Sequence, residues 1–156
     1  MTGFIVTAPA ADPEETPIVS GPFWPNIDPA TIREAQRIDN TVTPERLRMA
    51  LIEAIASTNH KLRTWREAQA ALGYVTLATV PADEIDETSI LEHRYLRAVG
   101  CLAKALLLER LRDFDATGKG DKKAESLTDP IDDCRRDHLH ALADILGEAR
   151  TVVELI

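Results

Sequence analysis

Aromatic and cysteine residues are scarce in this chain of 156 residues. Phe, Trp and Tyr together make up 4% of the sequence, whereas Ala and Leu are abundant, and this composition favours helices over sheet. The two cysteines, Cys101 and Cys134, lie far apart and belong to no CxxC pair. We therefore expect two small buried thiols among apolar helical neighbours rather than a disulfide.

Long apolar runs and positive charge are also in short supply. No stretch approaches the ~18 uninterrupted apolar residues of a membrane-spanning helix. The apolar run near Met1 is short and lacks the positive region of a signal peptide. The 26 acidic and 18 basic residues give a formal net charge of −8, the opposite of the balance usual in proteins that grip phosphates. We expect a soluble protein made in a reducing cytoplasm, with no membrane partner.

The stretch 118–126, "GKGDKKAES", has the composition of a phosphate-binding loop without its spacing. Such a loop needs GxxxxGK followed at once by Ser or Thr. Here Gly118 and Gly120 are only two positions apart, and the carboxylate of Asp121 would repel a phosphate. We interpret the stretch as a loop between helices, in which Lys119, Asp121, Lys122 and Lys123 either contact a neighbouring subunit or face solvent.

Metal and catalytic motifs are absent as well. His138 and His140 are two positions apart, whereas two histidines on one helix need a spacing of three or four to hold one metal ion. The acidic run 83–87 lacks the ligand spacing and the turn glycine of a calcium loop, and is expected to complement the amino end of the next helix. No nucleophilic serine motif occurs. The sequence therefore predicts no enzyme, no cofactor and no metal site.

Proline shapes the first 27 residues, which contain five prolines and neither Lys nor Arg. Because proline fixes φ and lacks a backbone donor, we expect an extended arm over residues 1–27. The adjacent Phe23 and Trp24 are unusual for a solvated linker. Two interpretations stay open: these side chains pack on their own domain, or they dock on a neighbouring subunit.

Helix start and stop signals divide residues 28–147. Asp28-Pro29 and Thr43-Pro44 each place an N-cap before a proline at the first helical position. Apolar side chains then recur at spacings of three and four, and Gly73 and Gly147 provide stops. The expected helices cover 28–38, 44–72, 88–114 and 121–146, with Pro130 either kinking the last one or starting its second half.

The expected fold is all-α. It is a small antiparallel helical bundle over 28–147, with an extended N-terminal arm over 1–27 and a short extended C-terminal tail over 148–156. The most apolar helix, 88–114, should be the centre of the core, and Leu62, Leu102 and Leu106 should be buried. The preceding connection is interpreted as a loop that packs across helix ends.

The last residues favour a strand that has no partner in the same chain. They are Thr151, Val152, Val153, Glu154, Leu155 and Ile156. A strand must pair its backbone groups, so we expect the tail to bind another protein by strand addition. The alternative is that the apolar side chains of the tail fold back on their own helices.

Several blocks together resemble one known family. They are "FWPNIDP" at 23–29, "TVTPERLRMAL" at 41–51, "VPADEID" at 80–86, "RYLRAV" at 94–99, "DATGKGDKKAES" at 115–126 and the terminal "VVELI". The chain resembles the phage head-completion proteins of the GPL family, which belong to temperate phages and prophages with contractile tails.

The resemblance implies a structural virion protein at the head–tail junction, assembled in the bacterial cytoplasm. It implies a ring of itself, of twelve copies, which binds the portal protein, offers a platform to a tail-terminator or tail-completion protein, and lets packaged DNA pass without specific binding. The tail residues 151–156 are then the candidates for the portal or tail interface, and Phe23, Trp24, Lys119, Asp121, Lys122 and Lys123 for contacts between subunits. The alternative function is a small helical DNA-packaging or DNA-binding module that uses Arg33, Arg37, Arg46 and Arg48.

Overall fold

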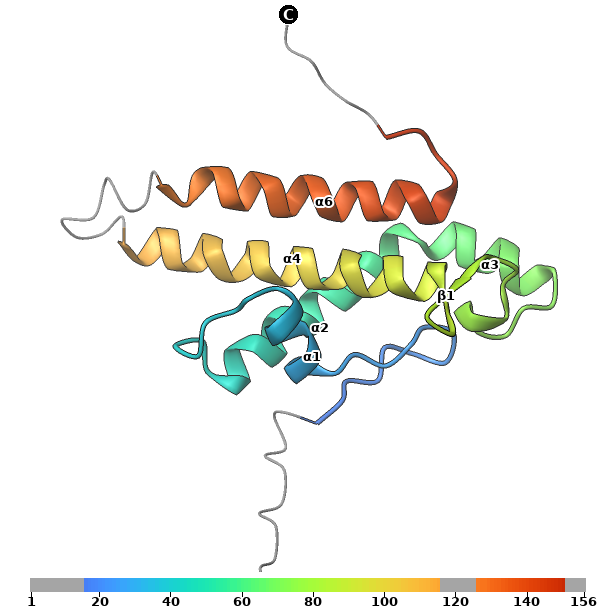
Figure 1. The fold of residues 1–156 in the computed structure, drawn as a ribbon, viewed down its shortest axis with the longest axis horizontal. Helices are drawn as coiled ribbons and strands as arrows, with labels where there is room; N and C mark the ends of the chain where they lie inside the picture. Colours follow the sequence, from blue (N-terminus) through green and yellow to red (C-terminus); the bar gives the residue numbers. More distant parts are fainter. Residues whose placement is uncertain (1–15, 116–125, 151–156) are drawn as a thin grey trace, which may run out of the picture.

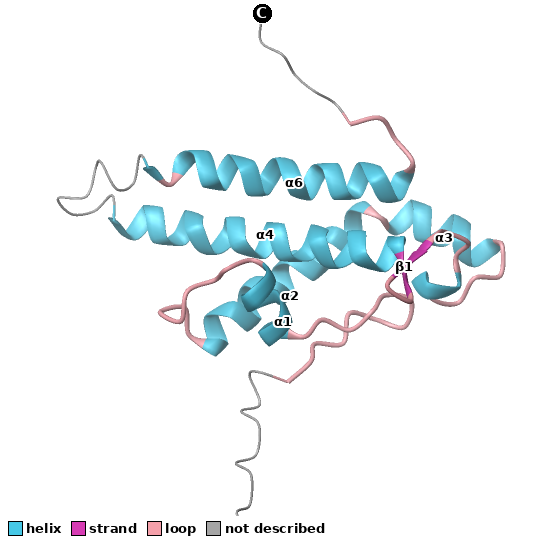
Figure 2. Cartoon of the chain, viewed as in Figure 1, coloured by secondary structure: helices cyan, strands magenta, loops and turns pink. Residues whose placement is uncertain are grey.

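The structure, a computed structural model, describes residues 16–115 and 126–150, and helices occupy most of them (Figures 1 and 2). Their order is α1 (Pro29–Ala35), α2 (Pro44–Lys61), α3 (Arg63–Ala71), the 3₁₀ turn η2 (Leu77–Thr79), β1 (Glu84–Ile85), β2 (Thr88–Ser89), α4 (Ile90–Asp115) and α6 (Thr128–Leu146). The protein is therefore mainly helical, as expected, but it also carries a small two-stranded sheet that the all-α expectation missed.

Helix α4 lies at the centre of the fold. Figure 1 shows α6 running antiparallel along one side of it, while α2 and α1 lie on the other side. Tyr95, Ala98, Val99 and Ala103 of α4 are completely buried. A helix covered on both sides loses most of its apolar surface to the core, which explains why its sequence is the most apolar of the set.

The helix starts predicted at Asp28-Pro29 and Thr43-Pro44 are confirmed, whereas the helix expected from residue 88 begins at Ile90 because residues 88–89 form β2. The carboxylate of Asp28 accepts hydrogen bonds from the amides of Ala30 and Thr31, and the hydroxyl of Thr43 accepts one from Arg46. These bonds satisfy amides that have no partner inside the helix. At the other end of the fold Gly147 closes α6 with φ of 71°, in the left-handed region that only glycine enters freely.

Residues 44–72 form two helices rather than one. The chain leaves regular helix geometry at Leu62, where ψ is 2° instead of about −42°. The Leu62 side chain is fully buried, so the break does not expose apolar surface. Beyond it, the ring of Trp65 in α3 lies 6.3 Å from that of Phe23 and 6.5 Å from that of Trp24. A continuous apolar stripe could not reveal this break, because the stripe continues through it.

Helix α6 begins at Thr128, so Pro130 lies in its first turn. Its missing N–H would have no partner inside the helix there, and the helix is not interrupted. Of the two expectations for Pro130, a kink or a helix start near Asp129, the structure shows the start.

An aromatic cluster joins the N-terminal segment to the core. Trp24 stacks on Tyr95 with the ring centroids 4.8 Å apart and the planes at 7°, and Phe23 meets Trp24 edge-on at 4.9 Å. The Tyr95 hydroxyl donates to the side-chain oxygen of Asn59 at 2.7 Å. The amide nitrogen of Asn59 donates to the carbonyl of Ser20 at 2.9 Å. Three separate segments are thus fixed at one point.

The described part of the predicted arm packs against the helices. Ile18 and Ile27 exchange two backbone hydrogen bonds of 2.7 and 2.9 Å and are both buried. Phe23 and Trp24 are only 5% and 7% exposed. The structure therefore places these two side chains in the core of their own chain, which is the first of the two interpretations left open by the sequence.

The connection before α4 contains a hairpin. The amide of Leu77 donates to the carbonyl of Phe23, and the Leu77 side chain is buried, so the connection packs against the body as expected. Further on, β1 pairs antiparallel with β2. The turn residues Asp86 and Glu87 have φ of 53° and 58°, the left-handed values of a tight hairpin turn. The acidic run therefore forms the exposed tip of a hairpin.

Two leucines of α4 predict a contrast in stability. Leu102 is 6% exposed in the core, whereas Leu106, which was expected to be buried, only packs against the edge of the core. Leu102→Ala should cost about 2–5 kcal/mol of unfolding free energy and Leu106→Ala roughly half as much. Urea titration of both variants measures the difference. An equal or larger cost at Leu106 would show that the helix face is assigned wrongly.

Candidate interaction surfaces

Residues 16–115 and 126–150 contain no group of three or more His, Cys, Asp or Glu side chains placed so that they could hold a metal ion. His138 is buried in α6, and its Nδ1 donates to the carbonyl of Ala98 at 2.9 Å. Burial is the main cause that lowers the pKa of His138, with Lys61 and Arg135 acting in the same direction. This histidine is thus a neutral core residue.

His138 predicts a pH dependence of stability. Its pKa in the folded protein lies below the unfolded value of about 6.5, so below that pH the unfolded chain binds more protons than the folded one. The unfolding free energy should therefore fall as the pH drops below about 6.5, by at most ~1.4 kcal/mol per unit. Urea titrations from pH 7.5 to 5.5 measure this slope. His138→Gln should flatten it and His140→Gln should not; an unchanged slope in His138→Gln would contradict the assignment.

The two cysteines lie on facing helices, Cys101 buried in α4 and Cys134 half-buried in α6, and both are free. Burial is the largest cause that raises the pKa of each thiol. Raised pKa values keep the thiols protonated and therefore weak as nucleophiles. They pack as small apolar side chains, as the sequence indicated.

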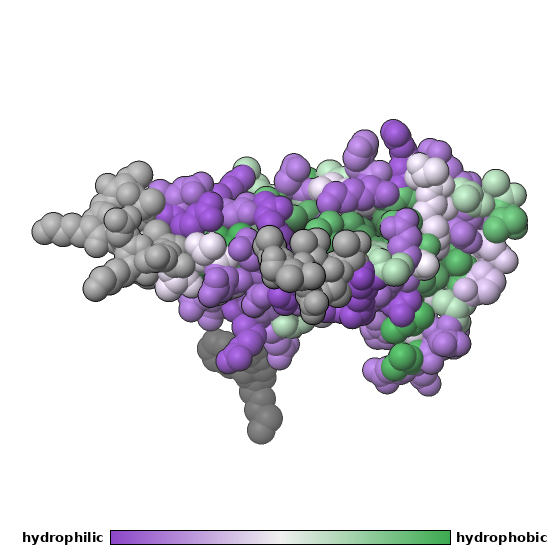
Figure 3. All heavy atoms as spheres, turned by 90° about the horizontal axis from the view of Figure 1, so that it is seen from above, coloured by the Kyte–Doolittle hydropathy of each residue, from purple (hydrophilic) through white to green (hydrophobic). Residues whose placement is uncertain are grey.

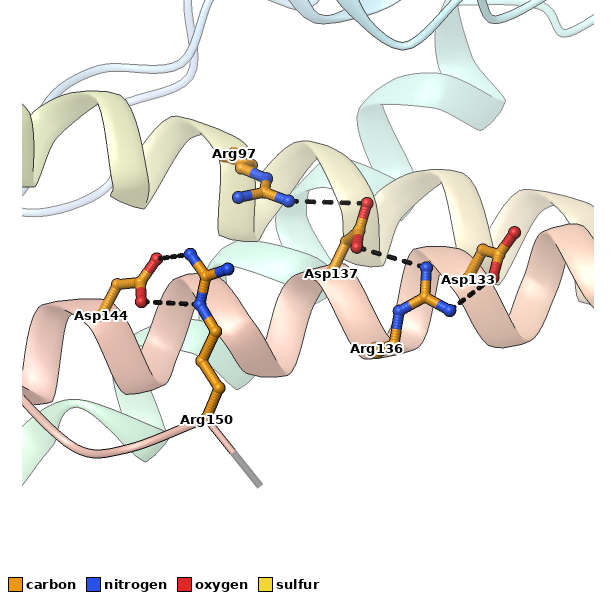
Figure 4. Close-up of polar contacts among 6 residues, drawn as sticks. All are labelled: Arg97, Asp133, Arg136, Asp137, Asp144 and Arg150. Carbon is orange, nitrogen blue, oxygen red and sulfur yellow. Dashed lines mark hydrogen bonds and ion pairs between the residues drawn. The ribbon is translucent and has the colours of Figure 1, made fainter. Parts of the chain in front are cut away.

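An exposed side of α6 carries a row of ion pairs, one of which joins it to α4 (Figure 4). Arg136 lies 2.7 Å from Asp133 and 3.7 Å from Asp137, and Arg97 of α4 lies 3.6 Å from Asp137. All four side chains are well exposed, so each pair contributes at most about 1 kcal/mol. The row leaves no uncompensated charge for an anionic or cationic partner.

A second group of contacts anchors the chain where it leaves α6. Arg150 forms a two-pronged ion pair with Asp144, with nitrogen–oxygen distances of 2.6 and 3.0 Å (Figure 4). Hydrogen bonding from Arg150 holds the pKa of Asp144 below its usual range. Arg94 of α4 also donates to the Asp144 carbonyl at 3.0 Å. The C-terminal segment therefore starts from a fixed point on the body.

Apolar side chains are exposed at the end of the molecule formed by α3 and the hairpin. Leu72 is 70% exposed, Val75 is 73% and Ile85 is 56%. Figure 3 shows hydrophobic surface at this end beside polar surface. Gathered apolar groups on a surface are typical of contacts with other proteins. In the sequence, the sign of this surface is the pair of apolar residues Leu72 and Val75 on either side of the helix stop at Gly73.

The arginines of the alternative DNA-binding hypothesis do not form one free basic face. The guanidinium of Arg33 donates to the carbonyls of Asp39 and Val42, both at 3.0 Å. That of Arg48 donates to the carbonyl of Thr16 at 2.8 Å. These two side chains hold the backbone of loops in place, which weakens the hypothesis.

The other predicted interface residues lie outside the described chain. They are Lys119, Asp121, Lys122 and Lys123 in the sequence between α4 and α6, and Thr151, Val152, Val153, Glu154, Leu155 and Ile156 after Arg150.

Comparison with known proteins decides the family. The sequence model of the phage head completion proteins (GPL) matches residues 18–156. The chain belongs to this family. This GPL protein is 45% identical over 152 residues to a head completion/stabilization protein of Escherichia phage P2. The aligned region covers 97% of the present chain and 89% of the P2 protein. No solved structure matches.

Membership confirms the resemblance and makes the protein a structural component of phage head completion. The match covers the helical body and both stretches that hold the predicted interface residues, 116–125 and 151–156. In the described ranges, no helix is long and apolar enough to span a membrane.

Proposed function

We propose that the protein completes the head as an adaptor ring, which binds the portal after DNA packaging and presents a platform to the tail. The family match over residues 18–156 carries this proposal. Its finer parts are a ring of twelve copies, the portal as one partner and a tail-terminator or tail-completion protein as the other. The place of action is the head–tail junction of the virion.

Charge at the two ends of the molecule supports a head-to-tail contact between copies. The hairpin lies at the start of α4 and carries Asp83, Glu84, Asp86 and Glu87, all exposed. Lys119, Lys122 and Lys123 follow the other end of α4 in the sequence, and that end lies about 39 Å away along a helix of 26 residues. The three lysines, which lie among the acidic residues Asp121 and Glu125, could pair with the carboxylates of the hairpin of a neighbouring copy. Such a heterologous contact closes into a ring when the rotation between copies allows.

The C-terminal tail has the features of a segment that attaches the protein to the portal. Residues 151–156 of the tail follow a point held by Arg150 and Asp144, and four of these six residues are apolar: Val152, Val153, Leu155 and Ile156. An extended segment presented from a fixed base can add a strand to a sheet of the portal. The net charge of −8 also suits a ring through which DNA passes without being gripped.

Completion of isolated heads tests the proposal. DNA-filled heads that lack this protein should release DNA and fail to join tails. Added protein should restore tail joining, and a variant with Lys119, Lys122 and Lys123 changed to Glu should not. Restoration without any binding of the protein to the portal vertex would overturn the proposal.

A further inference from the structure

A shallow hollow of about 340 Å³ lies between the N-terminal segment and α2–α3. One wall is formed by residues 20–24. The other wall follows one face of the helices at spacings of three and four, which places side chains in a single row. The residues of that row are Ala56, Asn59, His60, Arg63 and Arg66.

This hollow is a local basic site on an acidic protein. Arg63 is exposed and makes no ion pair with any residue in the described ranges. Arg66 has only a weak partner, Glu67, at 3.7 Å, and both side chains are exposed to solvent. The two arginines of α6, by contrast, have close acidic partners: Arg135 lies 2.6 Å from Glu109 and Arg136 lies 2.7 Å from Asp133. Two guanidinium groups on the rim of a hollow suit an extended segment that carries carboxylates.

We propose that the hollow receives the acidic stretch 12–15 of a second copy of this chain. Asp12, Glu14 and Glu15 lie in an N-terminal stretch that has no Lys or Arg, so its charge complements the arginines. Pro9 and Pro13 favour an extended backbone, which lowers the entropy lost on docking. This inference rests on the proposed assembly of copies.

A second copy is preferred as the source of the stretch because of the direction in which residues 16–20 run. The carbonyl of Thr16 is held by Arg48, near the start of α2. The Ser20 carbonyl is held by Asn59, so residues 16–20 run along α2 toward the hollow. To reach Arg63 of the same chain, the backbone would have to reverse direction at Thr16, whereas the stretch of a second copy can approach the hollow without such a turn.

Cross-linking between two full-length variants tests the contact. Glu14→Cys and Arg63→Cys chains are purified separately, mixed with portal and treated with a short bis-maleimide. We expect an adduct of two chains, mapped by mass spectrometry to positions 14 and 63. Its yield should exceed that of either variant alone and should fall in about 1 M salt, where the screening length is about 3 Å.

The matched control replaces another exposed arginine, Arg110→Cys, at the end of α4 away from α3 (Figure 1). A yield with Arg63→Cys no higher than with Arg110→Cys would overturn the proposal. A variant that carries both Glu14→Cys and Arg63→Cys is also treated at high dilution, and a 14–63 link formed within single chains would overturn the proposal. Binding of duplex DNA through Arg63 and Arg66, without any cross-link between chains, would overturn it as well. If the protein assembles on the portal but no 14–63 adduct forms, this inference is wrong and the proposed function stands. If the protein does not assemble on the portal, the proposed function is wrong as well.

Discussion

Removing residues 151–156 should abolish attachment of the protein to portal-bearing heads while leaving its thermal unfolding midpoint unchanged. In the proposed function the tail pairs its backbone with the portal, so its loss removes that contact completely. Arg150 must be kept, because its ion pair with Asp144 holds the end of the body. Co-sedimentation with heads measures attachment, and a thermal melt of the isolated protein measures stability.

A matched variant separates loss of the strand from loss of charge. Glu154→Gln removes the one acidic side chain of the tail and should retain attachment to the heads. A fall of many degrees in the unfolding midpoint of the truncated protein would show that the tail packs on its own helices. That result would rule out strand addition.

Trp24→Ala should cost about 3–5 kcal/mol of unfolding free energy. The indole is 7% exposed, stacks on Tyr95 and contacts Phe23, so its removal leaves a cavity where three segments meet. Urea or thermal unfolding measures the loss, which corresponds to roughly 6–20 °C in the midpoint.

The control for Trp24→Ala lies in the same segment. Val19 is 76% exposed, so Val19→Ala should change the unfolding free energy by less than about 0.5 kcal/mol. A cost below about 1 kcal/mol for Trp24→Ala would contradict the intramolecular packing of the aromatic cluster and would favour its docking on a neighbouring subunit.

Capping residues, prolines and glycines in the sequence predicted the helix ends that depend on neighbouring residues alone. An N-cap followed by proline placed the starts of α1 and α2, and Gly147 placed the end of α6. The break at Leu62 escaped prediction because a buried leucine fits both one long helix and two shorter ones. The hairpin escaped because its turn residues, Asp86 and Glu87, are not the Asn-Gly or Asp-Gly pair that usually marks such a turn.

The aromatic cluster and the hollow beside Arg63 were harder to predict from the sequence. A Phe-Trp pair among prolines is compatible with packing inside the chain or with docking outside it, and only the position of Tyr95 and Trp65 around the pair decides between them. The hollow beside Arg63 depends on residues 20–24 lying against α2 and α3, a contact between segments distant in the sequence. Periodicity within one helix carries no information about such contacts.

The most direct test of the central claim is the mass and symmetry of the portal complex. Purified portal is mixed with the protein, and the complex is weighed by native mass spectrometry and imaged by electron microscopy. The account predicts twelve added copies in a closed ring on the portal face that points to the tail. A complex without added mass, or with copies bound elsewhere and in no ring, would contradict it.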